Sequence, residues 1–299
     1  QIAVLEMGIS DFGEMARLTK IAKPDTCVIT NIGTCHLENL GDRDGVLKAK
    51  TEIFQSMKTN GHIVLNGDDD KLITVREYNG VKPVFFGLNS ERDVYADQIE
   101  SKGLKGVACR IHLGEDAFDV LVPTPGIHMV YNALAAAAVG RIYGLTIEEI
   151  RRGIESLETI RGRFKMIETD KFLVVDDCYN ANPMSMKASL DVLHDGEGRR
   201  VAILGDMGEL GEDEAALHEG VGIHAATCGI DACVCVGDLA VHIAEAARKA
   251  NPDFPVYYEK TRESLLEHLN DYVQKGDTIL VKASHFMKFE EVVKALEEM

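Results

Sequence analysis

Chemically active side chains crowd into one short run, VVDDCYNANP, at the end of a predicted strand. Asp176 and Asp177 are neighbours in it, so their side chains point to opposite faces of the strand. Because ligands of parallel sheets bind at the carboxyl ends of strands, we expect at least one of these carboxylates to face a crevice. Asn182 before Pro183 is a usual helix start and partly explains the run. The other polar residues exceed what a turn requires, which favours a functional site.

Three further polar residues stand at strand ends, or beside them, in the first half of the chain. Glu6 follows IAVL, His36 follows VITNIGTC, and Lys50 lies on a helix predicted over 45–57. Glu6 and His36 could place an oxygen and a nitrogen on a divalent cation, and Mg²⁺ typically takes one or two protein ligands beside water and phosphate oxygens. The alternative for each residue is an ordinary packed or solvated side chain. Spacing alone does not decide between the two.

The usual phosphate-binding loops do not accompany these residues. The chain has no Gly-Lys dipeptide, which excludes the pattern G-x-x-x-x-G-K-[ST] from it, and no G-x-G-x-x-G follows a strand. The turn Gly205–Gly208 follows the strand RRVAILGD, near the ends of parallel strands, where ligands bind. On its own this turn is a weak signal.

Strand-like and helical segments alternate in the first half, which predicts parallel strands joined by helices. The strand-like segments are IAVLEMG, TCVITNIG and HIVLNG, and the helical ones are 12–23 and 45–57. Residues 81–122 read instead as an antiparallel flank of the same sheet. Helices over 129–143 and 147–157 follow, the second opened by a capping box of Thr146 and Glu149.

The second half alternates in the same way after a break in periodicity over 158–164. Its predicted strands are FKMIET, KFLVVDD, RRVAILGDM, ACVCVG, PVYYE and DTILVKAS, with helices between them and one at the end. The sequence therefore predicts an α/β protein of two doubly wound domains, residues 1–160 and residues 161–299. The first would carry a mostly parallel sheet with an antiparallel flank.

The amino-acid composition of the chain argues against several classes of function. The chain of 299 residues has a net charge of -17 and lacks a dense basic cluster, which argues against nucleic acid as a partner. No apolar run is long enough for a membrane span. Seven cysteines, irregularly spaced, favour reduced thiols in a reducing compartment. Cys233 and Cys235 lie in an apolar strand without a matching second pair, so we expect buried thiols rather than a metal site.

Several segments from end to end resemble the Mur ligases. They are VLEMG, VITNIGTCHLENLG, LKAKTEIF, PGIHMVYNALAAAA, RGRF, VVDDCYNANPMSM, VAILGDMGELG and LVKASHFMKFEEVV. DDCYNANP together with GDMGELG is specific to the branch of this family that adds D-alanyl-D-alanine. The TN followed by His and then AK belongs to the wider family.

The resemblance implies a three-domain enzyme, of which the central ATPase-like domain and the C-terminal Rossmann-like domain are here. The family's P-loop lies just upstream of VLEMG, and Gln1 opens directly into that segment, so we expect the chain to be a fragment that is inactive alone. The implied activity is a cytoplasmic, ATP- and Mg²⁺-dependent ligase of peptidoglycan synthesis. It would join D-alanyl-D-alanine to UDP-N-acetylmuramoyl tripeptide through an acyl phosphate, and we expect a monomer.

The resemblance also assigns site residues. Glu6, His36 and Lys50 match catalytic and metal-binding positions, with Lys50 as the lysine that family members can carry as a carbamate. A carbamate supplies an anionic oxygen beside Mg²⁺, where an ammonium would be repelled. Asn132 matches a contact to adenine. The residues that match the part of the C-terminal domain closing over ATP are Arg163, Asp177, Asn180 and Asn182.

The sequence departs from the family pattern at a few positions. Met129 stands where an Asn is usual, which puts one nucleotide contact in doubt. Ala283 and His285 occupy a segment that often reads Lys-Gly-Ser-Arg, which leaves the roles of Lys282, Ser284 and His285 open.

Two alternatives remain at this point. One is another amino-acid-adding ligase of the same fold, such as the folylpolyglutamate or diaminopimelate-adding relatives, against which DDCYNANP argues. The other is a non-catalytic α/β binding module that lacks a P-loop. A substrate panel separates the first from our interpretation, and the upstream gene sequence separates the second.

Overall fold

The computed structural model describes residues 2–34 and 36–299; Gln1 and Cys35 lie outside them. The chain forms two compact units. The first extends to Leu157, apart from residues 103–105 and 124–126, and the second contains those two segments and runs from Glu158. The predicted division at 160/161 lies close to this point and stays a prediction for the functional domains. Among the described residues, no helix is long and apolar enough to span a membrane.

The sheet of the first unit has the strand order β1-β2-β3-β4-β5-β6 within the described chain. The strands are β1 (Thr26–Ile29), β2 (His62–Asn66), β3 (Val84–Gly87), β4 (Val94–Ser101), β5 (Val107–Leu113) and β6 (Asp116–Val122). Neighbours pair in parallel from β1 to β4, and β4, β5 and β6 pair antiparallel. This confirms a mostly parallel sheet with an antiparallel flank.

Two details of the predicted sheet were wrong. The segment VKPVFFGL was assigned to the antiparallel flank, but β3 pairs in parallel with both β2 and β4. The run IAVLEMG was expected to be a buried strand, but residues 2–9 are in neither helix nor strand, and Ile2, Val4 and Leu5 are 66%, 91% and 62% exposed. A strand needs a neighbouring strand to pair its backbone groups, and an apolar pattern does not supply one.

Helices cover this sheet and bury apolar residues against it. They are α1 (Glu14–Ala22), α2 (Leu37–Leu40), α3 (Arg43–Thr51), α4 (Ile127–Ile142) and α5 (Ile147–Glu155), with 3₁₀ turns at Glu52–Ser56 and Leu72–Thr74. The alternating burial along β5 places Cys109 and Ile111 in one core with Leu134 of α4. The predicted capping box of Thr146 and Glu149 is present at the start of α5.

The sheet of the second unit has the order β11-β10-β9-β12-β8-β7 in the described chain. The strands are β7 (Lys165–Glu168), β8 (Leu173–Asp176), β9 (Arg200–Gly205), β10 (Ala232–Val236), β11 (Val256–Glu259) and β12 (Thr278–Lys282). Only β7 runs antiparallel to its neighbour. Every residue of β10 and β12 is buried, as expected for parallel strands covered on both faces.

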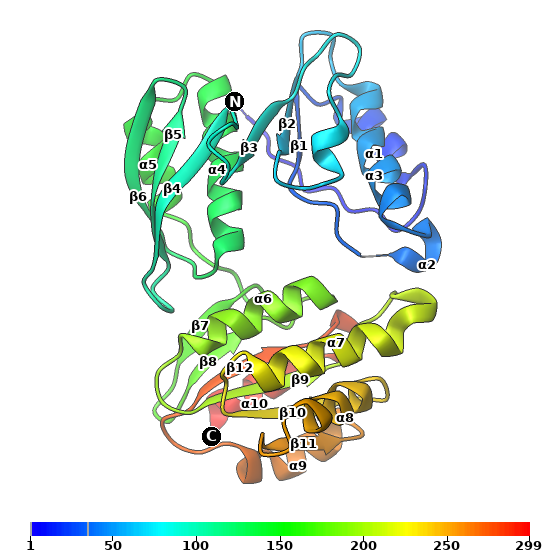
Figure 1. Cartoon of the computed structure of the whole chain (residues 1–299), viewed down its shortest axis with the longest axis vertical. Coiled ribbons are helices and arrows are strands. Elements are labelled where there is room, and N and C mark those ends of the chain that lie inside the picture. Colours follow the sequence, from blue (N-terminus) through cyan, green and yellow to red (C-terminus); the bar gives the residue numbers. More distant parts are fainter. Residues whose placement is uncertain (1, 35) are drawn as a thin grey trace. The chain divides into compact units, whose positions relative to one another are not determined.

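Helices lie on both faces of the second sheet (Figure 1). They are α6 (Pro183–His194), α7 (Glu214–Thr227), α8 (Ala240–Ala250), α9 (Arg262–Tyr272) and α10 (Glu290–Glu298), with 3₁₀ turns at Gly211–Asp213 and His285–Met287. The first three share one core and the last two another. The helices that follow β8 and β9 therefore lie on one face of the sheet, whereas the helix that follows β12, the strand between them, lies on the other face. This makes the carboxyl ends of these three strands the switch point, where doubly wound sheets bind ligands. The predicted α/β class with two doubly wound units is confirmed.

Candidate functional site

A buried ion pair joins two strand ends at the switch point of the second unit. The Lys282 Nζ at the end of β12 lies 2.6 Å from Asp177 Oδ2, just after β8, and the two side chains are 3% and 15% exposed. Asp177 also accepts hydrogen bonds from Ser189 Oγ at 2.7 Å and from the Phe164 backbone N–H at 3.2 Å. These three donors tie Asp177 to β12, to α6 and to the segment before β7.

Asp176, the other carboxylate of the pair, points elsewhere, as expected for adjacent strand residues. Its side chain is buried, and it accepts from the Gly162 N–H at 2.8 Å and from Cys178 Sγ at 3.0 Å. Burial, with the nearby Asp176 carboxylate, raises the pKa of the Cys178 thiol. Asp176 therefore fixes the turn around Gly162, and Asp177 is the carboxylate that pairs with Lys282.

The predicted residues Arg163, Asn180 and Asn182 lie around the same strand end. The Arg163 guanidinium sits 4.4 Å from the centre of the Tyr179 ring, and the Asn180 carbonyl oxygen accepts from Lys282 Nζ at 3.2 Å. Asn182 opens α6 in a reciprocal capping box with Ser185. The structure thus brings these residues together with Asp177, while their role towards ATP stays a prediction. Asn182 also has the ordinary capping role that its position before proline indicates.

The loop after β9 adds a second set of contacts at this edge. The Asp206 carboxylate accepts from the backbone N–H groups of Leu239 and Ala240, at 3.1 and 2.7 Å, at the start of α8. Burial raises its pKa, and these hydrogen bonds act in the opposite direction. Gly237 has φ 126°, and a Cβ there would lie 2.3 Å from Asp206 Oδ1, so only glycine fits. The weak sequence signal GDMG thus marks a tightly constrained loop.

Sequence reasoning missed Ser189 and His218, two polar residues of this region. Ser189 is buried on α6 and bonds Asp177, twelve residues earlier. His218 is fully buried on α7 and bonds the backbone of the loop after β9. Each looks like an ordinary helix residue in the sequence. Only tertiary contact reveals its role.

The predicted metal residues occupy the first unit. Glu6 is exposed in the irregular segment before α1, which corrects its expected place at the end of a buried strand, and His36 precedes α2 in a left-handed conformation. Lys50 on α3 donates from Nζ to the carbonyl oxygen of Asn31, just beyond β1, at 2.9 Å. These donors fit Mg²⁺ only in part. A carboxylate and an imidazole suit an ion held largely by phosphate and water, whereas an ammonium at Lys50 does not. Lys50 would suit such an ion only as a carbamate, and its metal-binding role stays a prediction.

Asn132 borders a hollow of about 470 Å³ in the first unit. It lies between α4 and α5, and its lining is mostly apolar, with Met129, Ala133, Ile150, Ile154 and Leu157 among the residues. The Asn132 amide donates to the Met129 sulfur at 3.4 Å. The lining also contains Glu149, whose carboxylate takes part in the capping box of α5, and the contact of Asn132 with adenine stays a prediction.

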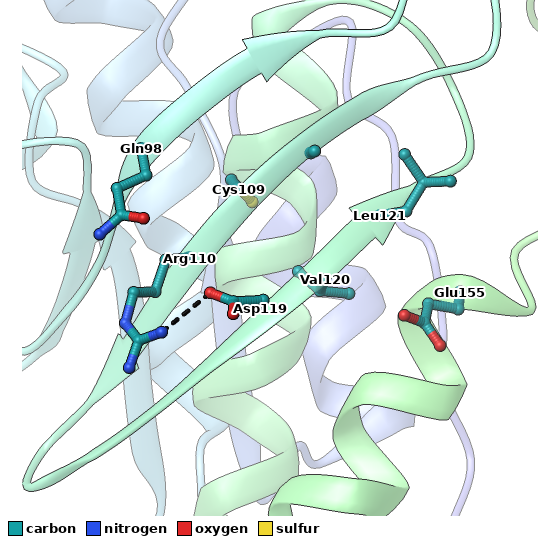
Figure 2. Close-up of a pocket in the computed structure, with 8 residues that line it drawn as sticks. Gln98, Cys109, Arg110, Asp119, Val120, Leu121 and Glu155 are labelled. Carbon is teal, nitrogen blue, oxygen red and sulfur yellow. Dashed lines mark hydrogen bonds and ion pairs between the residues drawn. The ribbon is translucent and has the colours of Figure 1, made fainter.

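Another hollow, of about 370 Å³, lies on the antiparallel flank of the first unit. Figure 2 shows the residues that line it. Its charged side chains Arg110 and Asp119 pair with each other at 3.0 Å, from adjacent strands. Gln98 and Glu155 complete the rim. Because Arg110 and Asp119 neutralise each other, neither side chain is poised for chemistry.

Comparison with known families matches both units. Residues 1–140 match the Mur ligase middle domain, and residues 162–285 match the Mur ligase glutamate ligase domain. The first matched stretch contains Glu6, His36, Lys50 and Asn132, and the second contains the Asp177–Lys282 pair.

Individual relatives match the chain over nearly its whole length. UDP-N-acetylmuramoyl-tripeptide--D-alanyl-D-alanine ligase of Bacillus subtilis is 37% identical over 100% of the chain, and that of Escherichia coli is 35% identical over 99%. The crystal structure of MurF from Acinetobacter baumannii superposes with a TM-score of 0.89 at 31% identity, covering 99% of this chain and 64% of that one. MurF ligase of Thermotoga maritima, solved in complex with ADP, gives 0.82 at 28%, covering 97% of this chain and 65% of that one. The chain spans 65% of the length of the two curated relatives, slightly less than two thirds.

Proposed function

The chain belongs to the Mur ligase family, and from this premise we propose that its protein is the ATP-dependent ligase that joins D-alanyl-D-alanine to UDP-N-acetylmuramoyl tripeptide. The observation that carries the proposal is the near-complete match to relatives of that name, at 37% and 35% identity. It agrees with the segments DDCYNANP and GDMGELG, which lie at the carboxyl ends of β8 and β9 at one switch point. Such a ligase acts in the cytoplasm, on precursors of peptidoglycan.

The reaction has two steps. The γ-phosphoryl group of ATP passes to the terminal carboxylate of the tripeptide, giving ADP and an acyl phosphate. The amine of D-alanyl-D-alanine then attacks the acyl carbon, a C–N bond forms, phosphate leaves, and the nitrogen loses a proton. Bound Mg²⁺ would offset charge on the phosphates.

The first unit would hold the nucleotide. Glu6 and His36, with Lys50 as a carbamate, are the residues proposed to hold Mg²⁺. Asn132 would bind the adenine base at the mouth of its apolar hollow, since an amide offers both a donor and an acceptor. The ADP complex of the Thermotoga maritima relative supports nucleotide use by this fold.

The second unit would present the incoming amine and close over ATP with Arg163, Asp177, Asn180 and Asn182. Lys282, held by Asp177, places one cationic group at the switch point. Because this site must shed water before the acyl phosphate forms, domain closure would protect that intermediate from hydrolysis.

Phosphate release from ATP tests the proposal. The complete product of the gene is assayed with Mg²⁺ and UDP-N-acetylmuramoyl tripeptide, and D-alanyl-D-alanine is compared with meso-diaminopimelate and L-glutamate. Turnover only with D-alanyl-D-alanine is the expected result. Turnover with another amino acid would assign the protein to a different branch of the family. No turnover with any of the amines would favour a binding module. The 299-residue chain, run beside it, tests whether these two units suffice.

A further inference from the structure

His218 is a fully buried imidazole in the middle of α7. A buried polar ring is costly unless both of its nitrogens find partners. Nε2 lies 2.9 Å from the backbone N of Met207, and Nδ1 lies 2.6 Å from the carbonyl oxygen of Glu214. Both partners belong to the backbone, so the ring connects its own helix to the loop after β9.

These two contacts define the form of the ring. A backbone N–H can only donate, so Nε2 must accept. A carbonyl oxygen can only accept, so Nδ1 must carry the hydrogen. His218 is therefore the neutral Nδ1–H tautomer, and burial lowers its pKa in agreement with this form. The charged groups around it are Asp206 and Glu214, with His242 from α8.

The loop that His218 holds supports the exposed segment after β12. Gly208, next to Met207, donates from its backbone N–H to Ser284 Oγ at 2.9 Å, and Ser284 donates from its own N–H to the Asp206 carbonyl oxygen at 3.0 Å. The Phe286 ring packs over Gly208, where an added Cβ would lie 3.0 Å from it. The direction of the peptides at 206–208 thus sets where the 3₁₀ turn His285–Met287 stands.

That 3₁₀ turn presents ring side chains at the switch point. Phe286 is 62% exposed, and His285 packs against the Tyr179 ring at 5.8 Å, beside the buried Asp177–Lys282 pair. Exposed rings suit a small ligand with apolar methyl groups, such as D-alanyl-D-alanine.

We infer that His218 is a positioning residue for the incoming dipeptide: by accepting from Met207 it fixes the loop on which Ser284 and Phe286 rest. It touches no substrate itself. The inference rests on the proposed function, because the dipeptide is the ligand that function requires.

Two amide variants provide a matched test in the complete gene product. His218→Gln places an acceptor oxygen where Nε2 stands and keeps the bond from Met207. His218→Asn is one methylene shorter and reaches only the Nδ1 side. KM for D-alanyl-D-alanine, KM for ATP and kcat are measured for each by phosphate release. Backbone hydrogen exchange at Met207 and Gly208 is followed in parallel.

We expect His218→Asn to raise KM for D-alanyl-D-alanine roughly tenfold, because the loop that loses its bond at Met207 would no longer hold Ser284 and Phe286 in place, with KM for ATP little changed. His218→Gln should stay within about threefold of wild type. Exchange at Met207 and Gly208 should rise in the Asn variant only. Equal KM changes for both substrates, or equal behaviour of the two variants, would overturn the role of His218. Wild-type protein without activity towards the dipeptide would instead refute the proposed function, and with it the ligand named here.

Discussion

Replacing Asp177 by alanine tests the buried ion pair that joins β8 to β12. The change removes the carboxylate that lies 2.6 Å from Lys282 Nζ and that also accepts from Ser189 and Phe164. Lys282, with a side chain 3% exposed, keeps the Asn180 carbonyl oxygen at 3.2 Å. A charge in such a place cannot recover its hydration without local unfolding.

The expected cost follows from that burial. Removing one partner of a buried ion pair costs about 3–5 kcal/mol, because the other charge stays buried. In a unit of this size the loss corresponds to a fall in Tm on the order of 10 °C. Asp177→Ala with Lys282→Met should be less destabilised than Asp177→Ala alone, because the second change removes the uncompensated charge.

Differential scanning calorimetry is the assay of choice, since the chain has no tryptophan to report unfolding by fluorescence. Because the core clusters of the two units are separate, we expect only the transition of the second unit to move. Glu297→Ala is the matched control. It breaks the 2.8 Å pair with Arg161, whose side chain is 68% exposed, at an expected cost below about 1 kcal/mol.

One pattern would refute the reasoning. If Asp177→Ala lowers Tm no more than Glu297→Ala does, the pair is not what holds the two strand ends together. If Lys282→Met adds its own full penalty to that of Asp177→Ala, the two side chains are not coupled.

Thr146→Ala removes the capping box of α5 and should lower the unfolding free energy of the first unit by about 1 kcal/mol, measured by urea denaturation followed by circular dichroism; an unchanged midpoint would contradict this. Lys50→Met in the complete gene product should reduce kcat on the order of 100-fold in the phosphate assay, while Lys48→Met on the exposed side of the same helix should leave it near wild type. Burial lowers the pKa of His218 in the folded protein below its ordinary 6.5. As the pH falls, the imidazole is therefore protonated in the unfolded chain before it is protonated in the folded one. The stability that the neutral ring contributes is complete above about pH 6.5 and is lost as the pH falls from there towards the folded pKa. In calorimetry, the Tm of the second unit should therefore fall less in His218→Gln than in wild type when the pH is lowered from about 7.5 to about 5.5. An equal fall in Tm would contradict this explanation.

Local signals predicted most of the elements. The capping boxes of Thr146 and Asn182 begin helices where the sequence placed them, and the apolar runs of β10 and β12 are fully buried strands. Cys233 and Cys235 are buried thiols in that sheet, as expected. These features depend on residues within one or two turns of each other, which is the range that sequence patterns report.

Features that depend on partners far along the chain were not predictable. IAVLEMG has a strand-like composition, but a strand also needs a neighbour, and Glu6 accordingly lies in an irregular segment. The pairing of Asp177 with Lys282 spans 105 positions, and that of His218 with Met207 depends on how α7 packs. Spacing predicted that at least one of Asp176 and Asp177 faces a crevice, but nothing in the sequence indicated that Lys282 would meet Asp177.

The place of β12 in its sheet affects how the second unit is made. This strand comes after the other strands of its sheet in the sequence, yet it fills the position between β8 and β9. During synthesis those two strands would emerge with a gap between them, and each would keep an open edge until residues 278–282 leave the ribosome. The unit can thus complete its core, and bring Lys282 to Asp177, only when nearly all of its sequence is present, so a premature stop before Thr278 should yield a chain prone to aggregation.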